Sequence, residues 1–203
     1  GFAETFTISS LRISIVPYAF SNKTELKTAV DLWNYGDESR ALNTYGHISN
    51  WNVSLVTDFS QLFNGVTFFN EDISNWDVSS GTDFSYMFAN ADSFNQDIGS
   101  WDVSNGTDFS MMFGGASTFN QNISSWEVGN GINFSQMFRD ASAFDQDISG
   151  WNVCNGINFE AMFEGAESFD QDISNWDTSA VTTMQNAFFK ASSFNQPIEH
   201  WNV

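Results

Sequence analysis

Hydrophobic residues recur along this chain at a fixed interval of 25 positions. The clearest marker is tryptophan, which stands at Trp51, Trp76, Trp101, Trp126, Trp151, Trp176 and Trp201. Because no insertion interrupts the interval, each interval must be one structural unit that stacks on the last. The pattern predicts an elongated stack of coils. We count positions within each coil from its tryptophan, which is position 0.

Within each interval, the apolar residues predict one short helix and one short strand. Phe84, Met87 and Phe88 follow the i, i+3, i+4 spacing of a helix with one buried face. Trp101 and Val103 alternate with polar residues, as in a half-buried strand. The sequence therefore predicts an α/β solenoid in which every coil holds one short strand and about two turns of helix.

The repeats occupy only part of the chain. Residues 1–46 lack the 25-residue interval, whereas residues 47–203 hold about six repeats. A stack of repeats exposes an apolar face at its end unless a different structure covers it. We therefore interpret residues 1–46 as an N-terminal cap on the first coil of the solenoid.

Local patterns predict the elements of this cap. Residues 5–16 alternate and are rich in branched side chains, which is typical of a strand. Asn22 precedes an acidic first turn and an apolar stripe, which together predict a capped helix over about residues 23–34. A second short helix is expected between Asp37 and Gly46. The cap is thus expected to contain a strand-like segment and helices.

Two rows of polar residues run along the expected stack. Position +19 holds Asn70, Asn95, Asn120, Asp145, Asp170 and Asn195, and position +20 holds Gln96, Gln121, Gln146, Gln171 and Gln196. Buried turns need hydrogen-bond partners for their backbone in every coil. We expect these side chains to bond the backbone of the neighbouring coil, as an asparagine ladder does.

The repeated phrase is similar to a known one. The pattern Met-Phe-x-x-Ala-x-x-Phe-Asn-Gln-Asp-Ile-Ser-x-Trp-Asp-Val-Ser resembles the 25-residue, lipoprotein-type repeat of BspA-like leucine-rich-repeat surface proteins of bacteria and unicellular algae. The resemblance covers about residues 22–203. It implies a right-handed, leucine-rich-repeat-like stack, secretion or surface attachment, and a role in adhesion or protein interaction without shared catalytic residues.

One feature departs from that family pattern. Repeats of the family carry Val-Thr-x-Met after the tryptophan corner, but position +5 is glycine here, at Gly81, Gly106, Gly131 and Gly156, and position +8 is phenylalanine in five coils. In one interpretation, the larger phenylalanine fills the space that valine leaves. In the other, the glycines expose bare backbone for the close approach of a partner.

Charge and cysteine usage narrow the classes of partner. The net charge is −19, with 25 acidic and six basic residues, so the surface repels phosphate backbones and anionic lipid headgroups. Nucleic-acid binding is not expected, and no apolar run is long enough for membrane insertion. Cys154 is the single cysteine, so no disulfide framework is expected. N-glycosylation sequons begin at Asn22, Asn52, Asn105, Asn122 and Asn133.

The pattern does not favour an enzyme. Catalysis needs one site, whereas a repeat supplies many identical positions. His47 and His200 lie at opposite ends of the repeat region, and no basic residue of the repeat is placed to activate Cys154. We therefore expect a non-catalytic protein that uses no cofactor, with calcium as a possible exception.

Calcium binding is the main chemical alternative. Stacking would bring the carboxylates of one row to about 5 Å apart, where they repel each other, and bridging cations would relieve that repulsion. Asparagine interrupts the rows, however, and the turns of calcium-binding β-rolls are missing. The candidate ligands are Asp72, Asp97, Asp147 and Asp172 at position +21 and Asp77 and Asp102 at position +1.

The sequence thus predicts a secreted or cell-surface scaffold, or an adhesion module that binds a protein or glycan. The exposed variable residues that could form its interaction surface are Tyr86, Met111, Gln136 and Arg139. A self-assembling fibre is an alternative, because the printed chain stops partway into a repeat, at Val203, and the strand-like N-terminal segment could complement that end. Such contacts would make a homo-oligomer through the ends of the solenoid.

Overall fold

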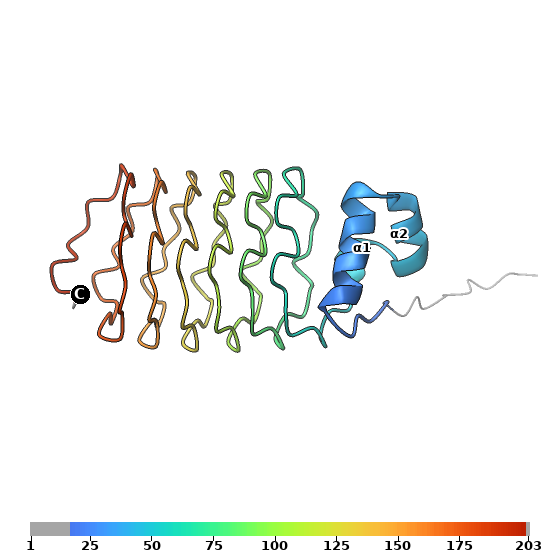
Figure 1. Ribbon diagram of the computed structural model, residues 1–203, viewed down its shortest axis with the longest axis horizontal. Helices are drawn as coiled ribbons and strands as arrows, with labels where there is room; N and C mark the ends of the chain where they lie inside the picture. Colours follow the sequence, from blue (N-terminus) through green and yellow to red (C-terminus); the bar gives the residue numbers. More distant parts are fainter. Residues whose placement is uncertain (1–16, 202–203) are drawn as a thin grey trace, which may run out of the picture.

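The computed structural model describes residues 17–201. It is an elongated row of stacked coils with two helices at its N-terminal end (Figure 1). The helices are α1 (Lys23–Tyr35) and α2 (Glu38–Tyr45), and a 3-10 helix, η1 (Ile48–Asn50), leads into the first tryptophan. We number the coils from coil 1 (residues 51–75) to coil 6 (residues 176–200).

Both helices begin at residues that satisfy backbone groups of their first turn, and α2 also ends at such a residue. The Asn22 side chain accepts a hydrogen bond from the Glu25 amide, and Asp37 does the same for the Arg40 amide. Gly46, with a φ of 79°, ends α2 and donates its amide to the Leu42 carbonyl. The buried face of α1 consists of Leu26, Ala29, Val30 and Trp33.

The core of the stack is built from columns of identical rings. At position +12, the Phe113 ring lies 5.7 Å from both the Phe88 and the Phe138 ring, with interplanar angles of 6° and 9°. Phe113 also stacks on Phe119 of its own coil at 4.0 Å. Further columns consist of the phenylalanines at positions +8 and +18 and the tryptophans at position 0. This continuous burial accounts for the 25-residue interval.

Tryptophan also forms hydrogen bonds along the stack. The indole nitrogen of Trp101 donates to the carbonyl of Ile73 at 3.2 Å, and that of Trp126 donates to the carbonyl of Ile98 at 3.1 Å. A buried indole N–H needs such a partner. The same residue therefore fills the core and satisfies a carbonyl 28 residues earlier in the chain.

The expectation of an α/β solenoid with a strand in every coil is wrong. Within residues 17–201 the structure has two α-helices, both outside the coils, and no strand. Each coil pairs with the next at a single parallel bridge, as between Asp83 and Asp108, and otherwise consists of turns and irregular backbone. Trp101 and Val103 are both buried, but they lie between tight turns. The Trp101 amide donates to the Ile98 carbonyl, and the Gly106 amide donates to the Val103 carbonyl.

The helix expected after each tryptophan is replaced by alternating turns. Met111 and Gly115 have left-handed backbone, with φ of 56° and 74°, and equivalent residues do so in every coil. Alternate amides therefore point along the stack: Met111 donates to Ser135 at 2.9 Å, and Phe113 donates to Met137 at 2.9 Å. These amides donate hydrogen bonds to the next coil, whereas in an α-helix they would donate to carbonyls four residues earlier in the same segment. The same apolar spacing is buried without a helix.

The polar rows form the hydrogen-bonded ladders expected from the sequence. The Asn120 Oδ1 atom accepts a hydrogen bond from the Asp145 amide at 3.0 Å and another from the Gln146 side chain at 2.8 Å. Asn95 makes the equivalent pair of bonds with Asn120 and Gln121. These side chains hold the turn at positions +19 and +20 to the preceding coil.

The glycine row at position +5 faces the core. Gly81 and Gly106 are buried, and a Cβ atom at either one would overlap the phenylalanine ring three residues later in the same coil. The same overlap would occur at Gly131 and Gly156. This geometry supports the interpretation in which phenylalanine fills the space that valine leaves, and it leaves no bare backbone for a partner at these positions.

The cap imitates a preceding coil over only part of coil 1. The Phe20 amide donates to the Asn52 carbonyl at 2.9 Å, and the Asn52 amide donates to the Tyr18 carbonyl at 3.0 Å. Lys23 binds Asp58 at 3.0 Å, and α1 runs along this end of the stack (Figure 1). The strand expected over residues 5–16, which the fibre hypothesis also requires, lies outside the described residues.

Candidate functional site: a groove between the cap and the first coil

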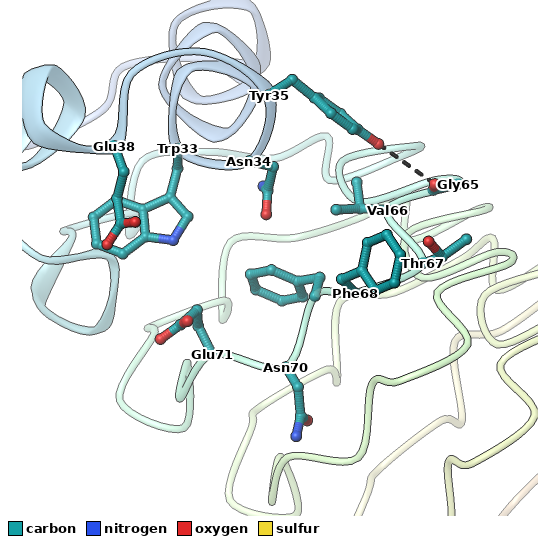
Figure 2. A pocket seen from close by; sticks show the side chains of 11 residues that line it. Trp33, Asn34, Tyr35, Glu38, Gly65, Val66, Thr67, Phe68, Asn70 and Glu71 are labelled. Carbon is teal, nitrogen blue, oxygen red and sulfur yellow. Dashed lines mark hydrogen bonds between the residues drawn. The ribbon is translucent and has the colours of Figure 1, made fainter.

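A groove of about 410 Å³ opens where the C-terminal end of α1 meets coil 1 (Figure 2). The cap contributes Trp33, Asn34, Tyr35 and Glu38, and coil 1 contributes residues 65–71. The Tyr35 hydroxyl reaches across to the Gly65 carbonyl at 3.4 Å, so the two sides touch at one edge. The groove occupies the place where a preceding coil would otherwise lie.

An unusually exposed aromatic ring lines this groove. Phe68 is 90% exposed, and Tyr35 is 64% exposed. Position +17 carries a small residue in the other coils, namely Ser93, Thr118, Ala143, Ser168 and Ser193. Phe68 therefore breaks the repeat at the one coil that has the cap beside it. A single exposed apolar residue is ordinary, but a large ring in a groove is typical of a contact surface.

Two backbone amides in the groove lack the partners that their equivalents have. The Asn95 amide donates to the Asn70 side chain at 2.9 Å, and the same bond recurs at position +19 through to Asn195. At position +17, the Ser93 amide donates to the Thr67 carbonyl at 3.0 Å, and the same bond recurs in coils 4 to 6. In coil 3 the Thr118 hydroxyl donates to the Asp92 carbonyl of the preceding coil at 2.6 Å. In coil 1 the Phe68 and Asn70 amides have no partner within residues 17–201.

The groove also carries negative charge without an ion pair. Glu71 stands at position +20, where the other coils have glutamine. Those glutamines donate to the preceding coil, as Gln96 does to the Asn70 carbonyl at 2.8 Å. A carboxylate accepts hydrogen bonds and does not donate them when ionised. Neither Glu71 nor Glu38 forms an ion pair with any residue in the described part of the chain.

The aspartates named as candidate calcium ligands accept hydrogen bonds within turns. Asp72 Oδ1 accepts hydrogen bonds from the Ser74 amide at 2.9 Å and the Ser74 hydroxyl at 2.7 Å. Each of the others likewise accepts from the amide two residues later, namely Asp77, Asp97, Asp102, Asp147 and Asp172. Between Pro17 and Trp201, no three histidine, cysteine, aspartate or glutamate side chains are grouped so that they could hold a metal ion.

The serines of these turns lower the pKa of their aspartates. The largest cause is the serine side chain, and the serine amide adds to it, as Ser74 does for the pKa of Asp72. The pKa is lowered in the same way at Asp102, Asp147, Asp172 and Asp177. All five carboxylates lie at the surface, so solvent weakens each individual effect.

These shifts predict that the stack loses stability in acid. A carboxylate whose pKa is lower in the folded state stabilises that state above its unfolded pKa, about 3.9 for aspartate. That stabilisation disappears as the pH falls through the lowered values. We therefore expect the free energy of unfolding to decline below about pH 4. Urea denaturation across this range, in high salt to screen the repulsion of the net −19 charge, measures it.

A matched variant isolates the turns. Asparagine at the same five positions keeps the acceptor oxygen, as Asn52 does for Ser54 in coil 1, but it does not titrate. This variant should have a flatter pH dependence. An identical acid profile in both proteins would contradict the assignment of the effect to these turns.

The residues expected to form the interaction surface lie on another part of the molecule. Tyr86, Met111 and Gln136 occupy position +10 of successive coils, each with left-handed backbone. Arg139 donates a hydrogen bond to Gln136 at 3.2 Å and lies 3.8 Å from Glu164. These four residues thus share one face of the stack, where Tyr86 is the exposed aromatic residue, and none of them lines the groove.

The sequons differ in how their side chains are used. Asn52 and Asn122 accept hydrogen bonds through Oδ1, whereas the side-chain nitrogen that a glycan would modify has no hydrogen-bond partner within residues 17–201. The Asn22, Asn105 and Asn133 side-chain nitrogens each donate a hydrogen bond, to Ser21, Ser79 and Asp108 respectively. Asn22 additionally caps α1.

The remaining reactive side chains serve the fold. His47 caps η1, accepting a hydrogen bond from the Ser49 amide, and its ring packs edge-on against Trp33. Cys154 replaces a turn serine and donates its amide to Asn152 at 3.2 Å. Neither helix of the described chain is both long and apolar enough to cross a lipid bilayer.

Together, the repeated coils and the capping helices define a repeat protein. The family model for a Mycoplasma protein of unknown function, DUF285, matches residues 35–148 and again residues 129–203. The chain therefore belongs to the DUF285 family. No match was found among curated proteins or among solved structures.

Sequence reasoning missed the groove, although two of its signals are visible in the sequence. Phe68 and Glu71 each break a row that is otherwise constant in type. Glu71 stands where the other coils have glutamine, three residues after the large side chain of Phe68. Together these two residues mark coil 1 as different from the other coils. The unpartnered amides, in contrast, become apparent only when the cap is seen beside the coil.

Proposed function

We propose that this chain is a non-catalytic, extracellular or cell-surface repeat protein that acts as a scaffold or adhesion module and binds a protein or glycan. The observation that carries the proposal is the groove beside coil 1. Elsewhere, the coils satisfy one another through stacked rings and ladders. The groove gathers an exposed ring with carboxylates and amides that have no partner within residues 17–201.

Two further considerations support this proposal. The residues that recur in every coil are used for packing and hydrogen bonding, and His47 and Cys154 have structural contacts, so a non-catalytic role fits their placement. The 25-residue repeat resembles that of BspA-like surface proteins, and the DUF285 match is consistent with that resemblance. A surface location is part of the same proposal.

Binding by beads coated with the chain tests the function. The beads are applied to an array of glycans and extracellular proteins, and retention is counted. We expect retention that the variant Phe68→Ser lowers, because serine is the residue of coils 2, 5 and 6 at this position and removes the exposed ring without disturbing the core. Leu55→Ser, which removes another exposed apolar side chain from the same coil (64% exposed, against 90% for Phe68), is the control.

Two results would contradict the proposal. One is the absence of retention on every array feature. The other is equal loss of retention with Leu55→Ser, which would indicate non-specific adhesion by exposed apolar residues rather than binding at the groove.

A further inference from the structure

The groove has the hydrogen-bonding pattern of a missing coil. In coils 2 to 6, the backbone at positions +17 to +20 faces an extended segment of the preceding coil. That segment supplies a carbonyl for the amide at +17 in coils 2, 4, 5 and 6, as Thr67 does for Ser93. It supplies a side-chain oxygen for the amide at +19 in all five coils, as Asn70 does for Asn95. Coil 1 has no preceding coil. The helices α1 and α2 leave a groove beside residues 65–71, and the Phe68 and Asn70 amides have no partner within residues 17–201.

We propose that this groove binds an extended peptide segment of a partner protein, which takes the place of the preceding coil and carries a lysine or arginine beside an apolar residue. This inference rests on the proposed function and specifies its ligand. A main-chain carbonyl of the segment accepts from the Phe68 amide, as carbonyls do when a strand is added to an open edge, and a side-chain oxygen of the segment accepts from the Asn70 amide, as Asn70 does for Asn95.

The basic side chain follows from Glu71. Every other residue at position +20 is a glutamine that donates to the preceding coil. Because ionised Glu71 can only accept a hydrogen bond, the molecule in the groove must supply the donor. A cationic donor forms the strongest hydrogen bond of this kind with a carboxylate. Glu38 lines the same groove and adds a second unpaired carboxylate.

The apolar side chain follows from Phe68. Its ring is almost wholly exposed in the free chain, so covering it on binding removes apolar area from water. An aromatic face beside carboxylates also attracts a lysine or arginine directly. A glycan could stack on the same ring, but it would not require a cation, and this difference separates the two classes of ligand.

The test uses the whole chain and two synthetic peptides with blocked ends. One reads Ala-Ser-Ser-Phe-Asn-Lys, which copies residues 191–195 of coil 6 and has lysine in place of Gln196. The other replaces its lysine with glutamate. Titration is followed by NMR of the backbone amides and by fluorescence polarisation. We expect the lysine peptide to bind and to shift the Phe68 and Asn70 amide signals, and the glutamate peptide to bind at least ~10-fold more weakly.

Variants of the chain identify the contacts. Glu71→Gln restores the residue of the other coils, and we expect it to weaken binding of the lysine peptide by about 10-fold and to reduce the salt dependence. Phe68→Ser should weaken binding comparably. Glu127→Gln, which removes an exposed carboxylate from coil 4, and Leu55→Ser should leave the affinity unchanged.

Defined outcomes would overturn the peptide inference. These are no binding of the lysine peptide at millimolar concentrations, equal affinity for the glutamate peptide, or no effect of Glu71→Gln. Retention of coated beads on glycans that depends on Phe68 but not on Glu71 would preserve the proposed function while rejecting a peptide as the ligand. If the chain neither binds the lysine peptide nor is retained on any feature of the array, the proposed function itself is rejected.

Discussion

Replacing Phe113 by alanine should lower the free energy of unfolding by about 3–5 kcal/mol, the usual range for a buried phenylalanine. Phe113 is fully buried. Its ring contacts Phe88, Phe138 and Phe119 at 5.7, 5.7 and 4.0 Å. A cavity here interrupts a ring column between coils 2 and 4. Because each coil is stabilised by its neighbours, the loss should weaken both sides of the stack.

Urea denaturation followed by both far-UV circular dichroism and tryptophan fluorescence measures this loss. Two probes are needed because cooperativity in repeat arrays can break down. The matched control is Phe188→Ala, the same position in coil 6, where the ring is only partly buried and stacks on Phe163 alone among the equivalent rings. An equal loss from both variants would show that the columns contribute little beyond local burial.

Replacing Gly106 by valine should also destabilise the protein, by about 1–3 kcal/mol, the range for overpacking a core. The reason is steric, since the new Cβ atom would overlap the Phe109 ring. Gly106 does not have left-handed backbone, so valine introduces no backbone strain. The replacement therefore tests the pairing of a small residue at +5 with a large one at +8.

A double-mutant cycle makes that test decisive. Phe109→Met alone leaves unfilled space, but together with Gly106→Val it recreates the Val181 and Met184 pair of coil 6. The loss in the double variant should be smaller than the sum of the single losses by at least ~1 kcal/mol. Coil 1 accommodates valine at +5 beside phenylalanine at +8, with Val56 and Phe59 both fully buried. If the two changes in coil 3 had additive effects, an interior coil would accommodate that pair as well, and the steric coupling would be rejected.

Much of the core could be predicted from the sequence because a repeat averages out local ambiguity. Phe94, Ile98 and Trp101 are buried as their spacing indicates, and the Asn95 and Gln96 rows form ladders between coils. Each inference drew on about six copies of the same position. The capped helix α1 was visible for a different reason, since its signals, Asn22 and the stripe that follows, are all local.

The conformation of the coil backbone was not predictable in the same way. A stripe at i, i+3 and i+4 is buried by a helix, and also by turns that alternate right- and left-handed residues. Met111 and Gln136 adopt positive φ although neither is glycine. The choice is made by amides such as those of Met111 and Phe113, which bond the next coil. A local pattern contains no information about these bonds.

The candidate site separates the two sources of information most clearly. The sequence by itself determined the unit of 25 residues, the burial of its aromatic and aliphatic positions, and its polar ladders, because these depend on side-chain chemistry repeated at one spacing. Only the tertiary structure decided which amides those ladders leave open. The cap pairs with coil 1 at Asn52 but stands off from Phe68 and Asn70, and that gap depends on how two helices pack against a coil rather than on any residue in the repeat.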